Sequence, residues 1–115
     1  MLCIRTTLCF FLALAVTTDS YGQFTDASGE LGFSGGGKAA FGDYNNDGYV
    51  DLYSGKLWRN ENGKRFVELT DSGIEGGEGI WGDYDNDGNL DLFTFTGSGK
   101  LYKNSGDGKF ETVAF

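Results

Sequence analysis

Histidine and proline are absent from the 115 residues, and the two cysteines, Cys3 and Cys9, both lie near the N-terminus. Without histidine, the common Ser–His and Cys–His pairs of nucleophile and base cannot form. Zinc and copper would also lack the nitrogen ligand that they prefer. A hydrolase that uses two carboxylates stays open in principle, but these absences favour a protein that is not an enzyme.

Residues 1–22 have the layout of a secretory signal peptide. Arg5 precedes an apolar run over residues 8–16, and the small residues Ser20 and Gly22 follow it. The run is too short to span a bilayer, so we predict cleavage near Gly22 and a secreted, extracellular protein. An uncleaved anchor or a buried strand is the alternative. The mature chain would then lack cysteine, and a small domain without disulfides needs a metal or association for stability.

The net charge of −8 is concentrated in two short segments, which hold seven of the 17 acidic residues. Outside these segments the acidic and basic residues nearly balance. Such a chain is poorly suited to nucleic acid or to an anionic membrane surface. Local acidity of this kind suits divalent cations instead.

The chain contains an internal repeat. Residues 41–53 match residues 81–93 at an offset of 40, and residues 57–60 match 101–104 at an offset of 44. The four additional residues of the second unit are expected in the turn at 97–99. We therefore divide the chain into the signal peptide (1–22), the end of a preceding unit or linker (23–40), repeat 1 (41–80) and repeat 2 (81–115).

Each repeat reads as four short strands. The first strand ends at Phe41 or Trp81, and the others are expected at 49–54, 56–60 and 64–69, and at 90–95, 100–104 and 109–113. Asp-Gly and Asn-Gly turns separate them. Four antiparallel strands in about 40 residues is the size of one propeller blade. The predicted fold is therefore all-β, with two four-stranded antiparallel blades of a partial propeller.

Aromatic residues recur at matching positions of the two repeats and include Trp58, Trp81, Phe66 and Phe110. Packing between the blades is the favoured interpretation, and a carbohydrate platform is the alternative. In the second strand, Val50 and Leu52 should lie on one side of the sheet, and Asp51 and Tyr53 on the other.

Two loops carry oxygen side chains at relative positions 1, 3, 5 and 9 with glycine at position 6. Calcium takes six to eight hard oxygen ligands, and a curled loop points alternate residues inward. Clustered carboxylates repel one another until a cation neutralises them. The position-12 acid of an EF-hand is missing, because Ser54 and Thr94 stand there. The predicted Ca²⁺ ligands are Asp43, Asn45, Asp47, Asp51 and the Tyr49 carbonyl, and Asp83, Asp85, Asp87, Asp91 and the Asn89 carbonyl.

These motifs resemble FG-GAP or VCBS repeats, the blades of integrin-α-type β-propellers. The resemblance covers residues 24–113 and rests on the aromatic-Gly-Asp-Tyr openings, the aspartate loops and the Leu-aromatic-basic-Asn segments at 57–60 and 101–104. It implies calcium in the hairpin that joins the first two strands of each blade, and adhesion or recognition without catalysis. The sequence departs from the family at Asn45, where aspartate is usual, and in having two blades.

Two functions follow as hypotheses. The first is a secreted calcium-binding module for adhesion or recognition of an extracellular protein or glycan. The second is a structural fragment of a larger or oligomeric propeller with no ligand of its own. Because two blades cannot close a ring, we expect self-association or further blades.

Overall fold

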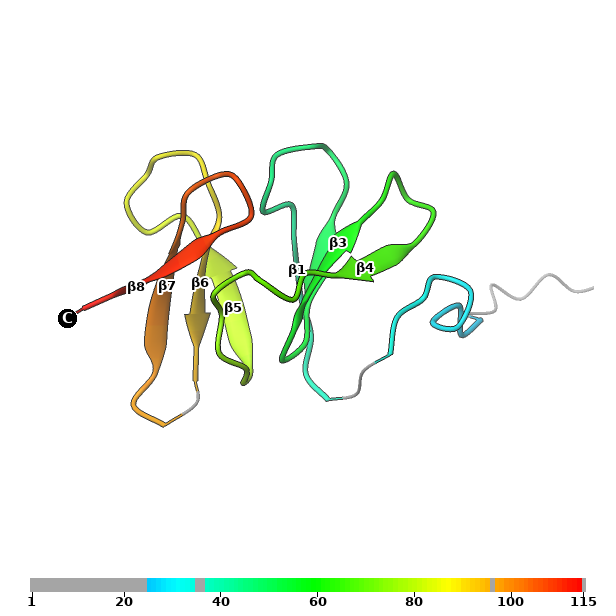
Figure 1. Cartoon of the computed structure of the whole chain (residues 1–115), viewed down its shortest axis with the longest axis horizontal. Coiled ribbons are helices and arrows are strands. Elements are labelled where there is room, and N and C mark those ends of the chain that lie inside the picture. The colour runs from blue at the N-terminus through cyan, green and yellow to red at the C-terminus, as the bar shows by residue number, and fades with distance from the viewer. Residues whose placement is uncertain (1–24, 35–36, 96, 115) are drawn as a thin grey trace, which may run out of the picture.

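The computed structural model describes residues 25–34, 37–95 and 97–114, which are all-β and contain no helix. Eight strands form two four-stranded antiparallel sheets, each in chain order (Figure 1). The first sheet contains β1 (Ala40–Gly42), β2 (Asp51–Tyr53), β3 (Leu57–Asn60) and β4 (Phe66–Glu68). The second contains β5 (Gly79–Gly82), β6 (Asp91–Thr94), β7 (Lys100–Asn104) and β8 (Phe110–Val113).

The predicted all-β class and the two antiparallel four-stranded sheets are confirmed, although the two sheets do not close into a ring. The expected signal peptide lies outside the described residues. Within those residues, no helix has the length and apolar character needed to cross a membrane. The predicted boundary between residues 80 and 81 falls inside β5, since the second sheet begins at Gly79.

The strands lie where the turn residues predict them, but several are shorter than expected. β2 begins at Asp51 and β6 at Asp91, because the residues just before them belong to the aspartate loops. The register also places the four additional residues of the second repeat. Leu52 pairs with Trp58, whereas Leu92 pairs with Tyr102. The longer hairpin therefore lies between β6 and β7, as predicted.

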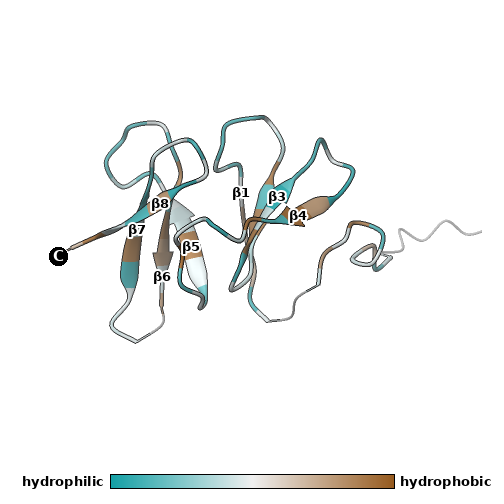
Figure 2. Cartoon of the chain, viewed as in Figure 1, coloured by the Kyte–Doolittle hydropathy of each residue, from teal (hydrophilic) through white to brown (hydrophobic). Residues whose placement is uncertain are grey.

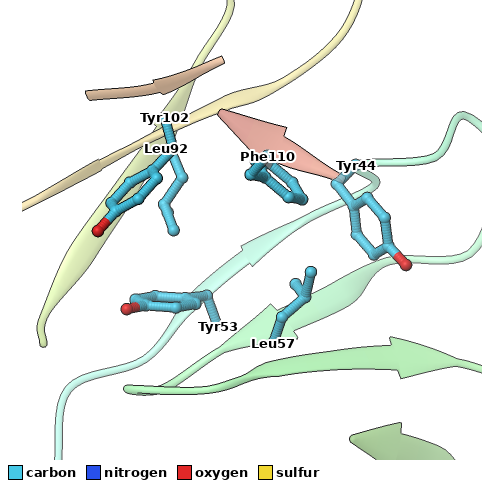
Figure 3. Close-up of a cluster of buried hydrophobic side chains, with 6 residues drawn as sticks. All are labelled: Tyr44, Tyr53, Leu57, Leu92, Tyr102 and Phe110. Atoms are coloured by element: carbon cyan, nitrogen blue, oxygen red, sulfur yellow. The ribbon is translucent and has the colours of Figure 1, made fainter. Parts of the chain in front are cut away.

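The core lies between the two sheets. Tyr53 and Leu57 of the first sheet point towards Leu92 and Tyr102 of the second (Figure 3). These four side chains are at most 1% exposed. Removing aromatic and aliphatic surface of this size from water is the main favourable term in such a fold. The remaining members of this core cluster are Tyr44 and Phe110, with Leu69, Ile74 and Trp81 packed against it.

The two sheets are in tight contact where Trp81 packs over Gly42. A Cβ atom on Gly42 would lie 2.7 Å from Trp81 Cδ1, so only glycine fits without a shift. The Trp81 indole donates a hydrogen bond to the Ala40 carbonyl at 3.1 Å, and its ring lies 6.2 Å from that of Tyr53. The expectation that Trp81 packs between the units is confirmed.

Both faces of β2 are covered, since Asp51, Leu52 and Tyr53 are all buried. On the side opposite the second sheet, Trp58 contacts Phe33 edge-on at 5.2 Å. Val50 precedes the strand and is half exposed. Figure 2 shows largely polar aspartate loops and strands of mixed character, with hydrophilic residues on β3 and β7.

The segment before the first sheet, predicted to be the end of a preceding unit or a linker, resembles the connector before the second sheet. The carbonyl of Leu31 accepts a hydrogen bond from Phe66 N at 2.6 Å, and the carbonyl of Ser72 accepts one from Phe110 N at 2.8 Å. In both places the segment that leads into a sheet accepts a hydrogen bond from the first residue of that sheet's last strand. Residues 25–34 therefore bear the same relation to the first sheet as the connector at 70–78 bears to the second.

Candidate metal centre

The two aspartate loops connect β1 to β2 and β5 to β6, and both lie at the same end of the molecule (Figure 1). Each loop curls around its first aspartate. The two Asp43 carboxylate oxygens accept hydrogen bonds from Asp47 N at 3.1 Å and Gly48 N at 2.8 Å. Asp83 accepts the equivalent bonds from Asp87 N at 3.0 Å and Gly88 N at 2.9 Å. The sequence match therefore extends to the same hydrogen-bonded turn.

The loops reverse direction through two left-handed residues each. Gly48 and Gly88 have φ values of 85° and 89°, as the glycine at position 6 predicts. Asn46 and Asn86, at position 4, have φ values of 56° and 61°. Asparagine is among the residue types that adopt this conformation most readily. The asparagine at position 4 was a usable sequence signal that the ligand pattern alone did not include.

The last aspartate of each loop, Asp51 or Asp91, is the first residue of an inner strand and is fully buried. The Asp51 carboxylate accepts hydrogen bonds from Tyr44 N at 3.2 Å and Asn60 N at 2.7 Å. The Asp91 carboxylate accepts them from Tyr84 N at 3.1 Å and Asn104 N at 2.8 Å. These backbone donors offset part of the cost of burying a carboxylate.

Burial nonetheless raises the pKa of Asp51 to about 6. Desolvation is the largest cause, and the hydrogen bonds from Asn60 and Tyr44 oppose it. The neighbouring carboxylates of Asp47 and Asp43 add a smaller upward contribution. A buried carboxylate that is costly to ionise beside other carboxylates is stabilised as an anion by a bound cation.

In the second loop, Asp83, Asp85 and Asp91 come together. One oxygen from each lies within 4.8 Å of the others, close enough for the three to contact a single ion. Elsewhere in the described residues, no three acidic side chains gather in this way. In the first loop, Asn45 takes the place of Asp85, and its amide donates to Asp47 Oδ2 at 3.0 Å.

The other predicted ligands are not part of this cluster of three carboxylates. Asp87 Oδ1 accepts a hydrogen bond from Asn89 N at 2.9 Å, and Asp47 Oδ1 accepts one from Tyr49 N at 2.9 Å. Both side chains thus stabilise their own loop, while their second oxygens bind the Lys103 ammonium group and the Asn45 amide, respectively. Metal ligation by these aspartates, and by the Tyr49 and Asn89 carbonyls, stays a prediction.

Lys103 belongs to the site, although sequence reasoning did not assign it there. Its ammonium group, on β7, contacts the carboxylates of Asp85 and Asp87, the latter at 2.9 Å. Hydrogen bonding to Asp85 and Asp87 raises the pKa of Lys103, and the same contact lowers the pKa of Asp87. The equivalent residue of the first repeat, Arg59, pairs with Glu61 at 2.9 Å. The repeat alignment shows a base at both positions, but only the side-chain contacts reveal which one reaches its loop.

The two loops also touch each other. The Asn46 side chain donates to the Gly88 carbonyl and to Asn89 Oδ1, both at 3.3 Å. The buried Asn104 side chain donates to the Tyr44 carbonyl at 2.7 Å and to the Leu90 carbonyl at 3.0 Å. The candidate metal centre is therefore a pair of adjoining loops.

Comparison with protein-family models, with curated proteins and with solved structures finds no match to this chain.

Proposed function

We propose that both aspartate loops bind Ca²⁺ and that the ions hold the β1–β2 and β5–β6 hairpins in place. The observation that supports this most directly is the convergence of Asp83, Asp85 and Asp91, one of them fully buried, within 4.8 Å. The available donors are carboxylate, amide and carbonyl oxygens, which match the preference of calcium for hard ligands. A calcium ion would supply positive charge, and the loop residues would bind it.

The two sites should differ in affinity. Asn45 makes the first loop one negative charge poorer than the second, where Asp85 stands. Lys103 opposes this difference, because its ammonium group already neutralises part of the second loop. At a calcium concentration ten times the dissociation constant, each occupied site would add about 1.4 kcal/mol to the free energy of unfolding.

At the biological level, we propose a secreted module that recognises an extracellular protein or glycan and performs no catalysis. The proposal rests on the resemblance to FG-GAP or VCBS blades and on the signal-like N-terminus. The alternative is that the chain is a structural part of a larger or oligomeric propeller and has no ligand of its own. The open arrangement of the two sheets is compatible with this alternative.

Calcium binding can be tested by isothermal titration and thermal unfolding of the purified full chain. We expect two calcium ions per chain, and a melting temperature that falls when EDTA is added. Asp85→Asn, which gives the second loop the side chain of the first, should weaken one site and spare the other. Asp107→Asn is the control, because Asp107 lies in a turn outside both loops and accepts a bond from Lys109 N. No heat of binding together with an unchanged melting temperature in EDTA would refute the calcium proposal.

Recognition requires a separate test. Full chain immobilised in calcium can be exposed to arrays of cell-surface proteins and glycans, and then washed with EDTA. Binding that EDTA releases supports the recognition module. Binding of calcium without any retained ligand would instead favour the structural alternative.

A further inference from the structure

The contact between the two sheets has a defined shape. Two apolar side chains of the second sheet, Trp81 and Leu90, lie over Gly42 of the first. A Cβ atom at Gly42 would be 2.7 Å from Trp81 Cδ1 and 3.1 Å from Leu90 Cδ1. Beside this glycine, Tyr53 and Leu57 complete the apolar surface and are 1% exposed. The first sheet thus presents an apolar face that includes a glycine and that the second sheet covers.

The second sheet carries the same face on its outer side. The residues equivalent to Gly42, Tyr53 and Leu57 are Gly82, Phe93 and Leu101, which with Ile80 we name the Gly82 face. They line a pocket of about 150 Å³. A Cβ atom at Gly82 would meet nothing within 4 Å, and Ile80 is 54% exposed. This face repeats the chemistry of the covered face, but no described residue packs over its glycine.

The complementary side chains lie on the far side of the first sheet. Phe41 and Val50 occupy the positions of Trp81 and Leu90, and we name these two residues the Phe41 face. Phe41 is 66% exposed and Val50 is 50% exposed. Strand alternation places Phe41 on the opposite side of its sheet from Gly42. The molecule therefore exposes an aromatic and an aliphatic side chain at one end of the stack, and a matching glycine at the other.

We propose that a second copy of this chain binds head to tail, with its Phe41 face on the Gly82 face of the first copy. The internal contact of Trp81 and Leu90 with Gly42 is the template for this interface. Residues 25–34 correspond to the connector at 70–78, and Phe33, two residues after Leu31, is the counterpart of Ile74, two residues after Ser72. Ile74 packs against the internal core without blocking the contact between the sheets. By the same arrangement, residues 25–34 leave room for the second copy. The proposal goes beyond calcium binding and does not depend on it.

Such an interface is heterologous, since two different faces meet. After each addition, one Phe41 face and one Gly82 face stay uncovered, at opposite ends of the stack. Head-to-tail stacking continues until the rotation closes a ring, or it extends as a filament. A stacking repeat buries its apolar faces in this way and gains stability from neighbours. A symmetric dimer that joins two Gly82 faces would instead stop at two copies.

Sedimentation velocity of the full chain in calcium, from about 1 to 100 µM, tests the association. We expect the mean mass to rise with concentration. Gly82→Ala should weaken association at least tenfold, because its methyl group would meet the incoming ring as a Cβ at Gly42 would meet Trp81. Its melting temperature at low concentration should stay unchanged, since the space around Gly82 is open. Phe41→Thr should weaken association similarly while keeping a good strand former.

Mixing the two variants tests the polarity of the interface. Phe41→Thr keeps an intact Gly82 face, and Gly82→Ala keeps an intact Phe41 face, so an equimolar mixture should form a heterodimer and go no further. A chain that stays monomeric at 100 µM would overturn the proposal, and so would variants that associate as the unmodified chain does. A mixture without heterodimer would overturn the head-to-tail arrangement.

Discussion

The side-chain amide of Asn104 donates a hydrogen bond of 2.7 Å to the main-chain carbonyl of Tyr44, which lies in the aspartate loop of the other repeat. Asn104 is fully buried, and its backbone N–H also binds the Asp91 carboxylate. The Tyr44 N–H in turn binds the Asp51 carboxylate. A continuous set of hydrogen bonds thus joins the last aspartate of one loop to that of the other, across the interface between the sheets.

Replacing Asn104 should therefore cost more than replacing its counterpart in the first repeat. Asn104→Ala removes two donated bonds and one accepted from Gly106 N inside the protein, so we expect a loss of about 2–4 kcal/mol in the free energy of unfolding. Asn60→Ala removes a bond to the Val50 carbonyl and one from Gly63 N, at an exposed site, and should cost about 1 kcal/mol. Urea denaturation measures both. Equal losses would show that the link to Tyr44 contributes nothing.

A second prediction concerns the Tyr53 hydroxyl group, which is buried and has no hydrogen-bond partner among the described residues. Burial raises the pKa of Tyr53 to about 12. Tyr53→Phe should leave the free energy of unfolding unchanged or raise it by about 1 kcal/mol, because an unpaired polar group leaves the core. Tyr102→Phe is the matched control, since the Tyr102 hydroxyl accepts a bond from Glu75 N at 3.2 Å and its loss should destabilise.

The same shift sets the behaviour of Tyr53 at high pH. Because its pKa is higher in the folded than in the unfolded chain, the stability it contributes is present below pH 10 and is lost between about pH 10 and 12. Tyr53→Phe should reduce this alkaline loss in unfolding curves. A loss of the same size in the variant and the unmodified chain would contradict the assignment to Tyr53.

Much of the fold could be predicted because local signals agree. Asp-Gly and Asn-Gly pairs predict the turns. Because the same pattern of turns occurs in both repeats, each repeat is predicted to contain four strands, and the structure has two four-stranded sheets. The aspartate loops were likewise readable, since each ligand position recurs at an offset of 40. The strand ends were less predictable, because Tyr49 and Val50 suit a strand but belong to the loop.

What could not be read was decided by contacts distant in sequence. The stacking of one sheet on the other requires the register that places Gly42 under Trp81, and no local pattern gives that register. The same holds for Asn104, whose partner Tyr44 lies 60 residues away. Lys103 and Arg59 align in the repeat, yet one faces its loop and the other pairs with Glu61.

Calcium binding to the first loop should weaken as the pH falls through about 6. The pKa of Asp51 is raised to about 6, so without calcium this group favours the folded state below pH 3.8, and that contribution is lost as the pH rises through 6. Calcium must displace this proton at lower pH, which weakens binding by up to about tenfold per pH unit below 6. Calorimetric titration at pH 5, 6 and 7 measures the effect. Asp51→Asn, which carries no such proton, should show a weaker site with a flatter pH dependence, and a steep dependence in that variant would point to another group.

Lys103 should act as an internal competitor of the ion in the second loop. Its ammonium group contacts both Asp85 and Asp87 and must give up these contacts when a cation binds there. Lys103→Met keeps the length of the side chain and removes the charge, so calcium should bind the second loop several-fold more tightly. Without calcium, the same variant should be less stable, because the clustered carboxylates then lose their counter-charge. Arg59→Met is the control, since Arg59 pairs with Glu61 outside the loops and its loss should leave calcium affinity unchanged. If Lys103→Met weakened binding or left it unchanged, the lysine would not compete with the ion, and the difference between the two loops would rest on Asn45 alone.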